Sequence, residues 1–180
     1  SYTVLMPSPD GVPQDAGLNA YSPAFDYLSE NIIFDFSVPH AQLDGSTIDQ
    51  FSFGTLNLLT GYFDTLAAGQ PASIQLLDPV FATNNNYIVA FDLVDGATAA
   101  NSGVYVRNIL TKGTKAITGL DLTGQRRISL GHPTFNRDDT AMYIQTRNTV
   151  NGTEYNPYLI VSSAIAKGGD GSWTRLQVRL

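Results

Sequence analysis

Residues 78–91 read Asp78-Pro79-Val80-Phe81-Ala82-Thr83-Asn84-Asn85-Asn86-Tyr87-Ile88-Val89-Ala90-Phe91. The stretch opens with a Pro-x-Phe strand signal, continues through a polar turn and ends in an apolar, β-rich run. Asparagine tolerates left-handed backbone and caps its own turns, so three in succession suit a tight turn between strands. The stretch therefore predicts a β-hairpin.

The same pattern occurs three times along the chain. Its copies open at Pro23, Pro79 and Pro133, which lie 56 and then 54 residues apart. Each copy continues with two more strand-like runs, and apolar and polar residues alternate in several of them. Four strands in a unit of about 50 residues is the size of a β-propeller blade. The additional runs cover residues 54–59 and 72–77, 103–109 and 126–130, and 158–162 and 173–178.

We therefore predict an all-β fold with about three and a half four-stranded antiparallel blades in one domain, residues 1–180. A blade has two apolar faces and buries them by stacking on its neighbours, so the Phe of each Pro-x-Phe signal is expected to pack between blades. Three and a half blades fall below the usual minimum of about four for a closed ring. We expect a larger propeller or one completed by a partner or a second copy. The predicted units are a half blade at 1–22 and blades at 23–78, 79–132 and 133–180.

Composition excludes several classes of function. Charged residues make up 14% of the chain, and the formal net charge is −6. So acidic a chain is a poor ligand for nucleic acid, and its basic residues are scattered. There is no cysteine, which removes disulfides and thiolate metal sites. No apolar run approaches the roughly 18 residues of a membrane-spanning helix.

The repeats at 22–36, 78–91 and 132–145 resemble the TolB-like, WD40-related β-propeller repeat. The turns depart from that pattern, because Asn84-Asn85-Asn86 and Arg137-Asp138-Asp139 replace the usual Ser-Pro-Asp-Gly. The resemblance implies a propeller found in periplasmic scaffolds, in prolyl-oligopeptidase-like peptidases and in some polysaccharide lyases. It also implies a location outside the cytoplasm, periplasmic or secreted, and leaves the function open.

The two histidines, His40 and His132, each flank a proline. A histidine just before the first strand of a blade is positioned to line a central channel, although the commoner role is a turn residue bonded to backbone. Two histidines without cysteine do not predict a zinc site. The acidic positions Asp35, Asp92 and 138–139 lack a calcium-loop pattern, and we expect them to be solvated. No cofactor or metal is predicted.

Aromatic residues near turns are candidates for ligand contact. Tyr62, Tyr155 and Tyr158 could stack on a sugar or grip a peptide, although blade packing is the commoner role of such residues. Together with His40 and His132 they form the predicted binding set. No nucleophile motif such as Gly-x-Ser-x-Gly is present, so no catalytic residue is predicted.

We therefore expect a non-catalytic propeller module that binds a protein or a carbohydrate through its loops, mainly 37–50, 92–102 and 147–157. One alternative is the propeller part of an enzyme, a lyase or a prolyl-oligopeptidase-like peptidase with a histidine lining the channel. Another is a purely structural half that assembles with a partner.

Overall fold

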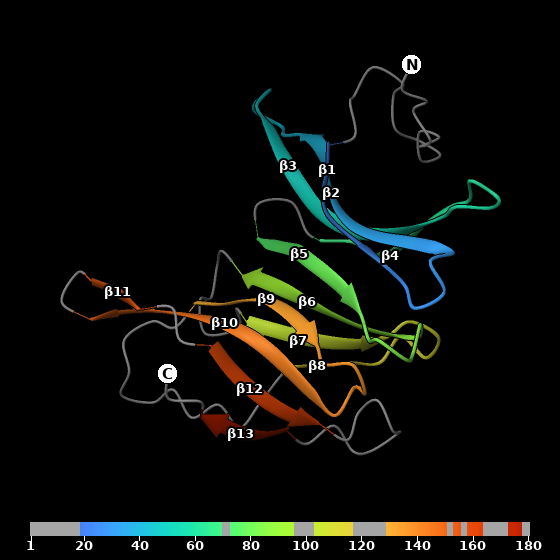
Figure 1. Cartoon of the computed structure of the whole chain (residues 1–180). Coiled ribbons are helices and arrows are strands. Elements are labelled where there is room, and N and C mark those ends of the chain that lie inside the picture. The colour runs from blue at the N-terminus through green and yellow to red at the C-terminus, as the bar shows by residue number, and fades with distance from the viewer. Residues whose placement is uncertain are drawn as a thin grey trace.

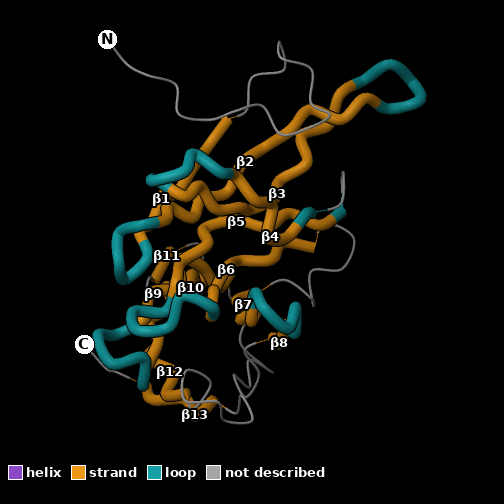
Figure 2. The backbone as a smooth tube through the Cα atoms, turned by 90° about the vertical axis from the view of Figure 1, so that its right-hand side faces the viewer, coloured by secondary structure: helices purple, strands orange, loops and turns teal. Residues whose placement is uncertain are grey.

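The chain folds into three antiparallel β-sheets that follow one another along the sequence and stack in the same order (Figure 1). The structure is a computed structural model. It describes residues 19–69, 73–95, 103–116, 129–150, 153–155, 158–163 and 173–177. Figure 2, in which strands are orange, shows strands and loops but no helix in this described part.

The first two sheets each contain four strands in sequence order. In the third sheet, β10 pairs with β9, β12 and the short β11, and β12 pairs with β13. The first sheet holds β1 (Asn19–Phe25), β2 (Asn31–Ala41), β3 (Thr47–Asn57) and β4 (Phe63–Ala67). The second holds β5 (Ile74–Phe81), β6 (Ile88–Asp95), β7 (Gly103–Asn108) and β8 (Thr114–Ala116). The third holds β9 (Ser129–Phe135), β10 (Ala141–Val150), β11 (Thr153–Tyr155), β12 (Tyr158–Ser163) and β13 (Trp173–Gln177).

The all-β, antiparallel prediction is confirmed, and the sheets are compatible with propeller blades. The described residues form a stack and do not close a ring. The predicted half blade at 1–22 lies outside the described residues up to position 18. Residues 19–22 are not a separate element, because they begin β1 of the first sheet.

The prediction is wrong about the fourth strands of the first two units. Residues 72–77 were expected to end the first unit, but from Ile74 they run without a break into the second Pro-x-Phe signal as β5. The true fourth strand of the first sheet is β4. Likewise, Ser129 already belongs to β9 of the third sheet. The sheets therefore span 19–67, 74–116 and 129–177 rather than beginning at the prolines.

Apolar side chains fill both spaces between neighbouring sheets. Ile33 and Phe53 of the first sheet pack with Val89 and Phe91 of the second, and the Phe53 and Phe91 rings lie 4.8 Å apart between centroids. On the other face of the second sheet, Ala90 joins a cluster that also holds Phe135, Met142 and Ile144 of the third sheet. Successive residues of β6 thus serve two interfaces, as the alternation of a strand requires.

The expected packing of the three repeat phenylalanines between sheets is confirmed for two of them. Phe81 is 6% exposed in the first interface, and Phe135 is 8% exposed in the second. For Phe25 the prediction is wrong, because its side chain is 61% exposed. No described sheet lies before the first one to cover it.

Polar contacts join the turns of the second and third sheets. The buried Asp139 carboxylate accepts hydrogen bonds from the backbone N–H groups of Thr83 and Asn84, each at 2.6 Å. Hydrogen bonds to a carboxylate are stronger than neutral ones, so this contact fixes the relative position of the two sheets. Asp139 is therefore structural and not the solvated turn residue that the sequence suggested.

Gly54 of β3 lies directly beneath an aromatic ring. A Cβ at this position would stand 2.9 Å from the Phe63 ring and 2.6 Å from the Asp64 carbonyl oxygen. Phe63 in turn packs against Phe34 and Phe36, with ring centroids 5.7 and 5.4 Å away. A side chain at position 54 would disrupt this aromatic cluster.

We expect Gly54→Ala to lower the free energy of unfolding by roughly 1–3 kcal/mol, because overpacking displaces Phe63 or the β3–β4 pairing. Urea denaturation followed by circular dichroism measures the change. Gly113→Ala is the matched control, since its nearest contact would be an ordinary 3.4 Å. Equal losses in both variants would contradict the close approach.

Candidate functional site

The first strands of the three sheets lie side by side and place three equivalent residues together. β5 contacts both β1 and β9. The residue before the repeat proline is Ser22 in β1, Asp78 in β5 and His132 in β9. All three have left-handed backbone, with φ of 44°, 48° and 50°. The repeat thus builds one conformation three times at adjoining positions.

A register shift accompanies this conformation in every sheet. The pairing of the first strand with the second is interrupted between Tyr21 and Ala24, between Leu77 and Val80, and opposite 143–145. Left-handed backbone is costly for residues with a side chain, by about 1–3 kcal/mol, and a following proline restricts the residue further. Bulges of this kind redirect side chains. Here they direct three polar side chains toward one another.

These side chains and two carboxylates from the second strands form what we call the axial cluster, namely Ser22, Asp35, Asp78, Asp92 and His132. The Ser22 hydroxyl donates to Asp78 Oδ1 at 2.5 Å. His132 Nδ1 lies 3.1 Å from Asp78 Oδ2, and the His132 backbone N–H donates to Asp92 Oδ2 at 3.0 Å. The cluster therefore links all three sheets through Asp78 and Asp92.

The environment of Asp92 opposes ionisation. Burial is the main cause that raises the pKa of Asp92 from 3.8 to about 8, and the neighbouring Asp78 and Asp35 raise it further. The hydrogen bond from the His132 backbone acts in the opposite direction. Burial also raises the pKa of Asp35, with a smaller contribution from the charge of Asp78. At neutral pH the cluster thus holds Asp92 mainly in its protonated form.

Two oxygens of the cluster lack hydrogen-bond donors. Asp35 is 3% exposed and Asp92 is 6% exposed, and the Oδ1 atom of each is buried with no donor among the described residues. A buried polar atom without a partner is costly and calls for an explanation. The cluster reaches solvent through Asp78 and His132, whose side chains are 22% and 66% exposed.

The order of the hydrogen bonds does not favour nucleophilic catalysis. In a Ser-His-Asp relay the imidazole lies between the hydroxyl and the carboxylate. Here the carboxylate of Asp78 lies between Ser22 and His132. Within the described residues, no three His, Cys, Asp or Glu side chains are grouped so as to hold a metal ion. The cluster instead holds more acceptor atoms than donors, because the Oδ1 atoms of Asp35 and Asp92 have no donor among the described residues.

The structure does not bring the five predicted binding residues together. His132 belongs to the axial cluster, whereas His40 pairs with Ile48 at the start of β3 and Tyr62 follows the end of β3. The part of β3 from position 48 to position 57 is about 30 Å long, so His40 and Tyr62 lie near opposite ends of that strand. The side chains of Tyr155 in β11 and Tyr158 in β12 lie outside the described part of the structure.

The predicted binding loops are only partly loops. Residues 37–41 and 47–50 belong to β2 and β3, so the connection there is a turn at 42–46. Asp92 belongs to β6 and is buried, which corrects its expected place in a solvated loop. Residues 96–102, 151–152 and 156–157 lie outside the described residues.

Sequence reasoning missed Ser22 and Asp78, although a signal was present. Both immediately precede the repeat proline, in the position that His132 occupies in the third copy. Comparing the three copies with one another would have marked this position as one that recurs in every repeat. Asp35 lies opposite Tyr21 and Asp92 lies opposite Leu77, so placing them in the cluster requires the register of β1 with β2 and of β5 with β6.

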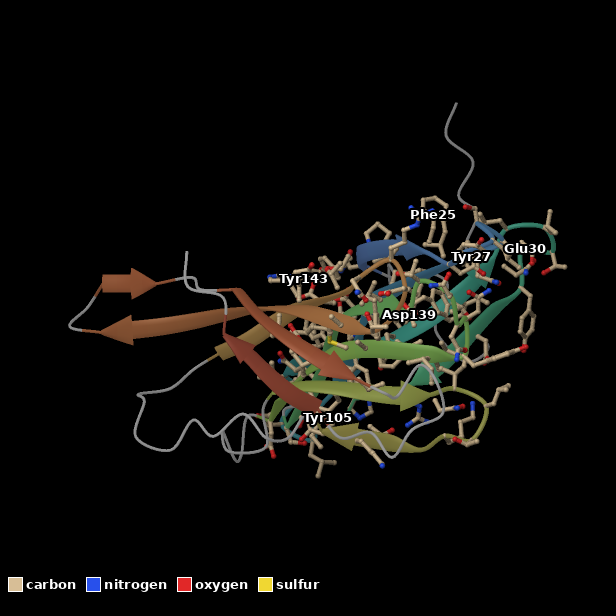
Figure 3. The ribbon with its side chains drawn as sticks, turned by 60° about the horizontal axis from the view of Figure 1, so that its bottom comes forward. Phe25, Tyr27, Glu30, Tyr105, Asp139 and Tyr143 are labelled. Atoms are coloured by element: carbon tan, nitrogen blue, oxygen red, sulfur yellow. The ribbon has the colours of Figure 1, made fainter. Side chains whose placement is uncertain are left out.

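The open end before the first sheet carries an exposed apolar patch. We call Phe25, Tyr27 and Leu28 the leading patch, with exposed fractions of 61%, 65% and 57%. Phe25 pairs with Ile32 as Phe81 pairs with Val89 and Phe135 with Met142, so the three phenylalanines occupy one structural position. Figure 3 shows Phe25 and Tyr27 together and Tyr143 apart from them.

The open end after the third sheet has the complementary feature. Ile33, Ala90 and Tyr143 occupy one position, since they pair with Ala24, Val80 and Thr134. Ile33 and Ala90 are fully buried by the sheet that follows each of them, whereas Tyr143 is 42% exposed. The first and third sheets thus each expose a position that is buried in the interior of the stack.

Comparison with known proteins does not assign a family. No protein-family model matches the chain, and no curated protein matches it significantly. None of the described segments is a helix with the length and hydrophobicity needed to cross a membrane. The likeness to the TolB-like repeat therefore stays a prediction.

We expect Asp92→Asn to change how stability depends on pH. The unfolded state releases the Asp92 proton above 3.8, while the folded state keeps it until about 8. Between these values a rise in pH lowers the free energy of unfolding by up to about 1.4 kcal/mol per unit through this group, and Asn removes that loss. Urea midpoints across this range test the expectation. Asp64→Asn, at an exposed position of β4, should keep the wild-type slope. An unchanged slope in Asp92→Asn would contradict the burial argument.

Proposed function

We propose that this chain is a non-catalytic β-propeller interaction module that binds a protein chain through the open ends of its sheet stack. The observation that carries the proposal is the contrast between Phe25, 61% exposed, and its equivalents Phe81 and Phe135, 6% and 8% exposed. The same position is buried between sheets in the second and third repeats and exposed in the first, which indicates a surface suited to contact with another sheet.

A second copy of the chain is the partner that fits this surface best. Within the stack, Phe81 packs in the same cluster as Ile33 of the preceding sheet. Tyr143 of the third sheet is equivalent to Ile33 and is partly exposed, so it can pack against Phe25 of a second copy in the same way. Head-to-tail contacts between copies form a ring when their rotation closes. Two copies would supply six sheets, within the usual range of propellers.

The rest of the sheet face that carries the leading patch is already covered. Phe34 and Phe36 are already 4% and 3% exposed and pack with Phe63. The surface available for a partner is therefore the leading patch at the end of β1 and in the turn after it. Exposed aromatic side chains in such a place are typical of residues that dominate binding energy.

Loop recognition of a carbohydrate, an enzymatic role and a location outside the cytoplasm stay predictions from sequence. The hydrogen-bond order in the axial cluster does not support the enzymatic alternative.

Light scattering at increasing concentration tests the proposal. We expect wild-type protein to pass from one to two chain masses, and Phe25→Ser and Tyr143→Ser each to raise the dissociation constant at least about tenfold. Leu43→Ser is the control, because Leu43 is fully exposed at the tip of the β2–β3 hairpin. A wild-type monomer at every concentration, or a dimer indifferent to Phe25→Ser, would refute the second copy as partner.

A further inference from the structure

The axial cluster has a composition that a structural role alone does not account for. Three carboxylates from β2, β5 and β6 lie near one another, and the charges that shift the pKa values of Asp35 and Asp92 come from carboxylates. Burying like charges together is costly unless a cation or protons compensate. The side chains alone satisfy this demand only by protonation.

The two unpaired oxygens indicate what is missing. Oδ1 of Asp35 and Oδ1 of Asp92 are buried in side chains more than nine-tenths covered, and neither has a donor among the described residues. The Ser22 hydroxyl donates to Asp78 Oδ1 and the His132 backbone N–H donates to Asp92 Oδ2, so these donors are used elsewhere. A cation with several hydrogen-bond donors that enters the cluster would pair with both oxygens and displace the proton from Asp92.

A metal ion does not meet this demand as well as an organic cation. The described residues contain no group of three carboxylate or histidine ligands with metal-binding geometry. Guanidinium and ammonium groups carry several N–H donors and pair with carboxylates at the distances of ordinary hydrogen bonds. The cluster's oxygens come from different sheets, and a branched donor can reach more than one of them.

We propose that the axial cluster binds an organic cation with several N–H donors, a guanidinium or a primary ammonium group, which donates to the unpaired oxygens of Asp35 and Asp92. Asp78 is the one partly exposed carboxylate of the three, so it would meet the charge first. Ser22 and His132 hold Asp78 in place from the neighbouring sheets. The site is independent of the leading patch and of any second copy.

The wild-type protein provides the first test. Isothermal titration calorimetry with the Nα-acetylated forms of L-argininamide, L-lysinamide and L-citrulline amide separates the contributions. Acetylation removes the α-ammonium group, so acetylated citrulline amide has the shape of the argininamide derivative without any positive charge. We expect one or both of the side-chain cations to bind, with citrulline amide at least about tenfold weaker. Comparing argininamide with lysinamide tells which donor group the cluster prefers. Equal binding of argininamide and citrulline amide, or no binding of either cation, would overturn the proposal.

Matched variants locate the site. Asp78→Asn keeps the size of the side chain and suits the left-handed backbone at position 78, and it should weaken binding of the cation at least about tenfold. Asp64→Asn removes one carboxylate from an exposed position of β4 and should leave binding unchanged. Circular dichroism confirms that each variant is folded. Unchanged affinity in folded Asp78→Asn, or calcium chloride competing fully with argininamide at equal concentration, would contradict an organic-cation site.

Discussion

The contact between apolar faces of successive sheets is the interaction on which the rest of this structure depends. Each sheet has two apolar faces, and a sheet that stands alone cannot bury both. The Phe53–Phe91 contact in one interface and the burial of Met142 and Ile144 in the other show how completely neighbouring sheets solve this problem. The line of first strands that carries the axial cluster follows from this stack.

Stacking also explains why the cluster exists where it does. The bulge before each repeat proline is built into the sequence of a single sheet, but only the stack brings Ser22, Asp78 and His132 into contact. The strained positions of the three repeats thus form one polar cluster together. The same stack buries Asp92, and burial raises its pKa to about 8. Strain and unfavourable electrostatics coincide in one place, as is common where a protein binds something.

Sequence periodicity predicted much of this fold and little of its site. The turn residues and the alternation of apolar residues located the hairpins, because both signals are local. The fourth strands were misassigned, since β4 is only five residues long, whereas the apolar run before Pro79 continues into β5. From sequence alone, the run at 74–77 can be a separate fourth strand of the first sheet or the beginning of a strand that continues past Pro79. Only its pairing with β6 decides between the two.

The candidate site was harder to foresee for a related reason. His132 was singled out as a histidine, yet its partner Asp78 lies 54 residues earlier and reaches it only across a sheet interface. Phe25 was expected to be buried because the repeat makes it equivalent to Phe81, and a repeat pattern does not reveal which copy stands at an end. Sequence repeats therefore predict the strands within each sheet but not the contacts that each sheet makes with its neighbours.

A double-mutant cycle between Phe53 and Phe91 tests the sheet stack most directly, with leucine at each position to keep the core apolar. The two rings belong to different sheets and lie 4.8 Å apart between centroids. The stack predicts a coupling energy of about 0.5–1.5 kcal/mol in urea unfolding, as measured for other aromatic pairs in contact. Losses that add to within about 0.3 kcal/mol would mean that the first and second sheets do not pack face to face.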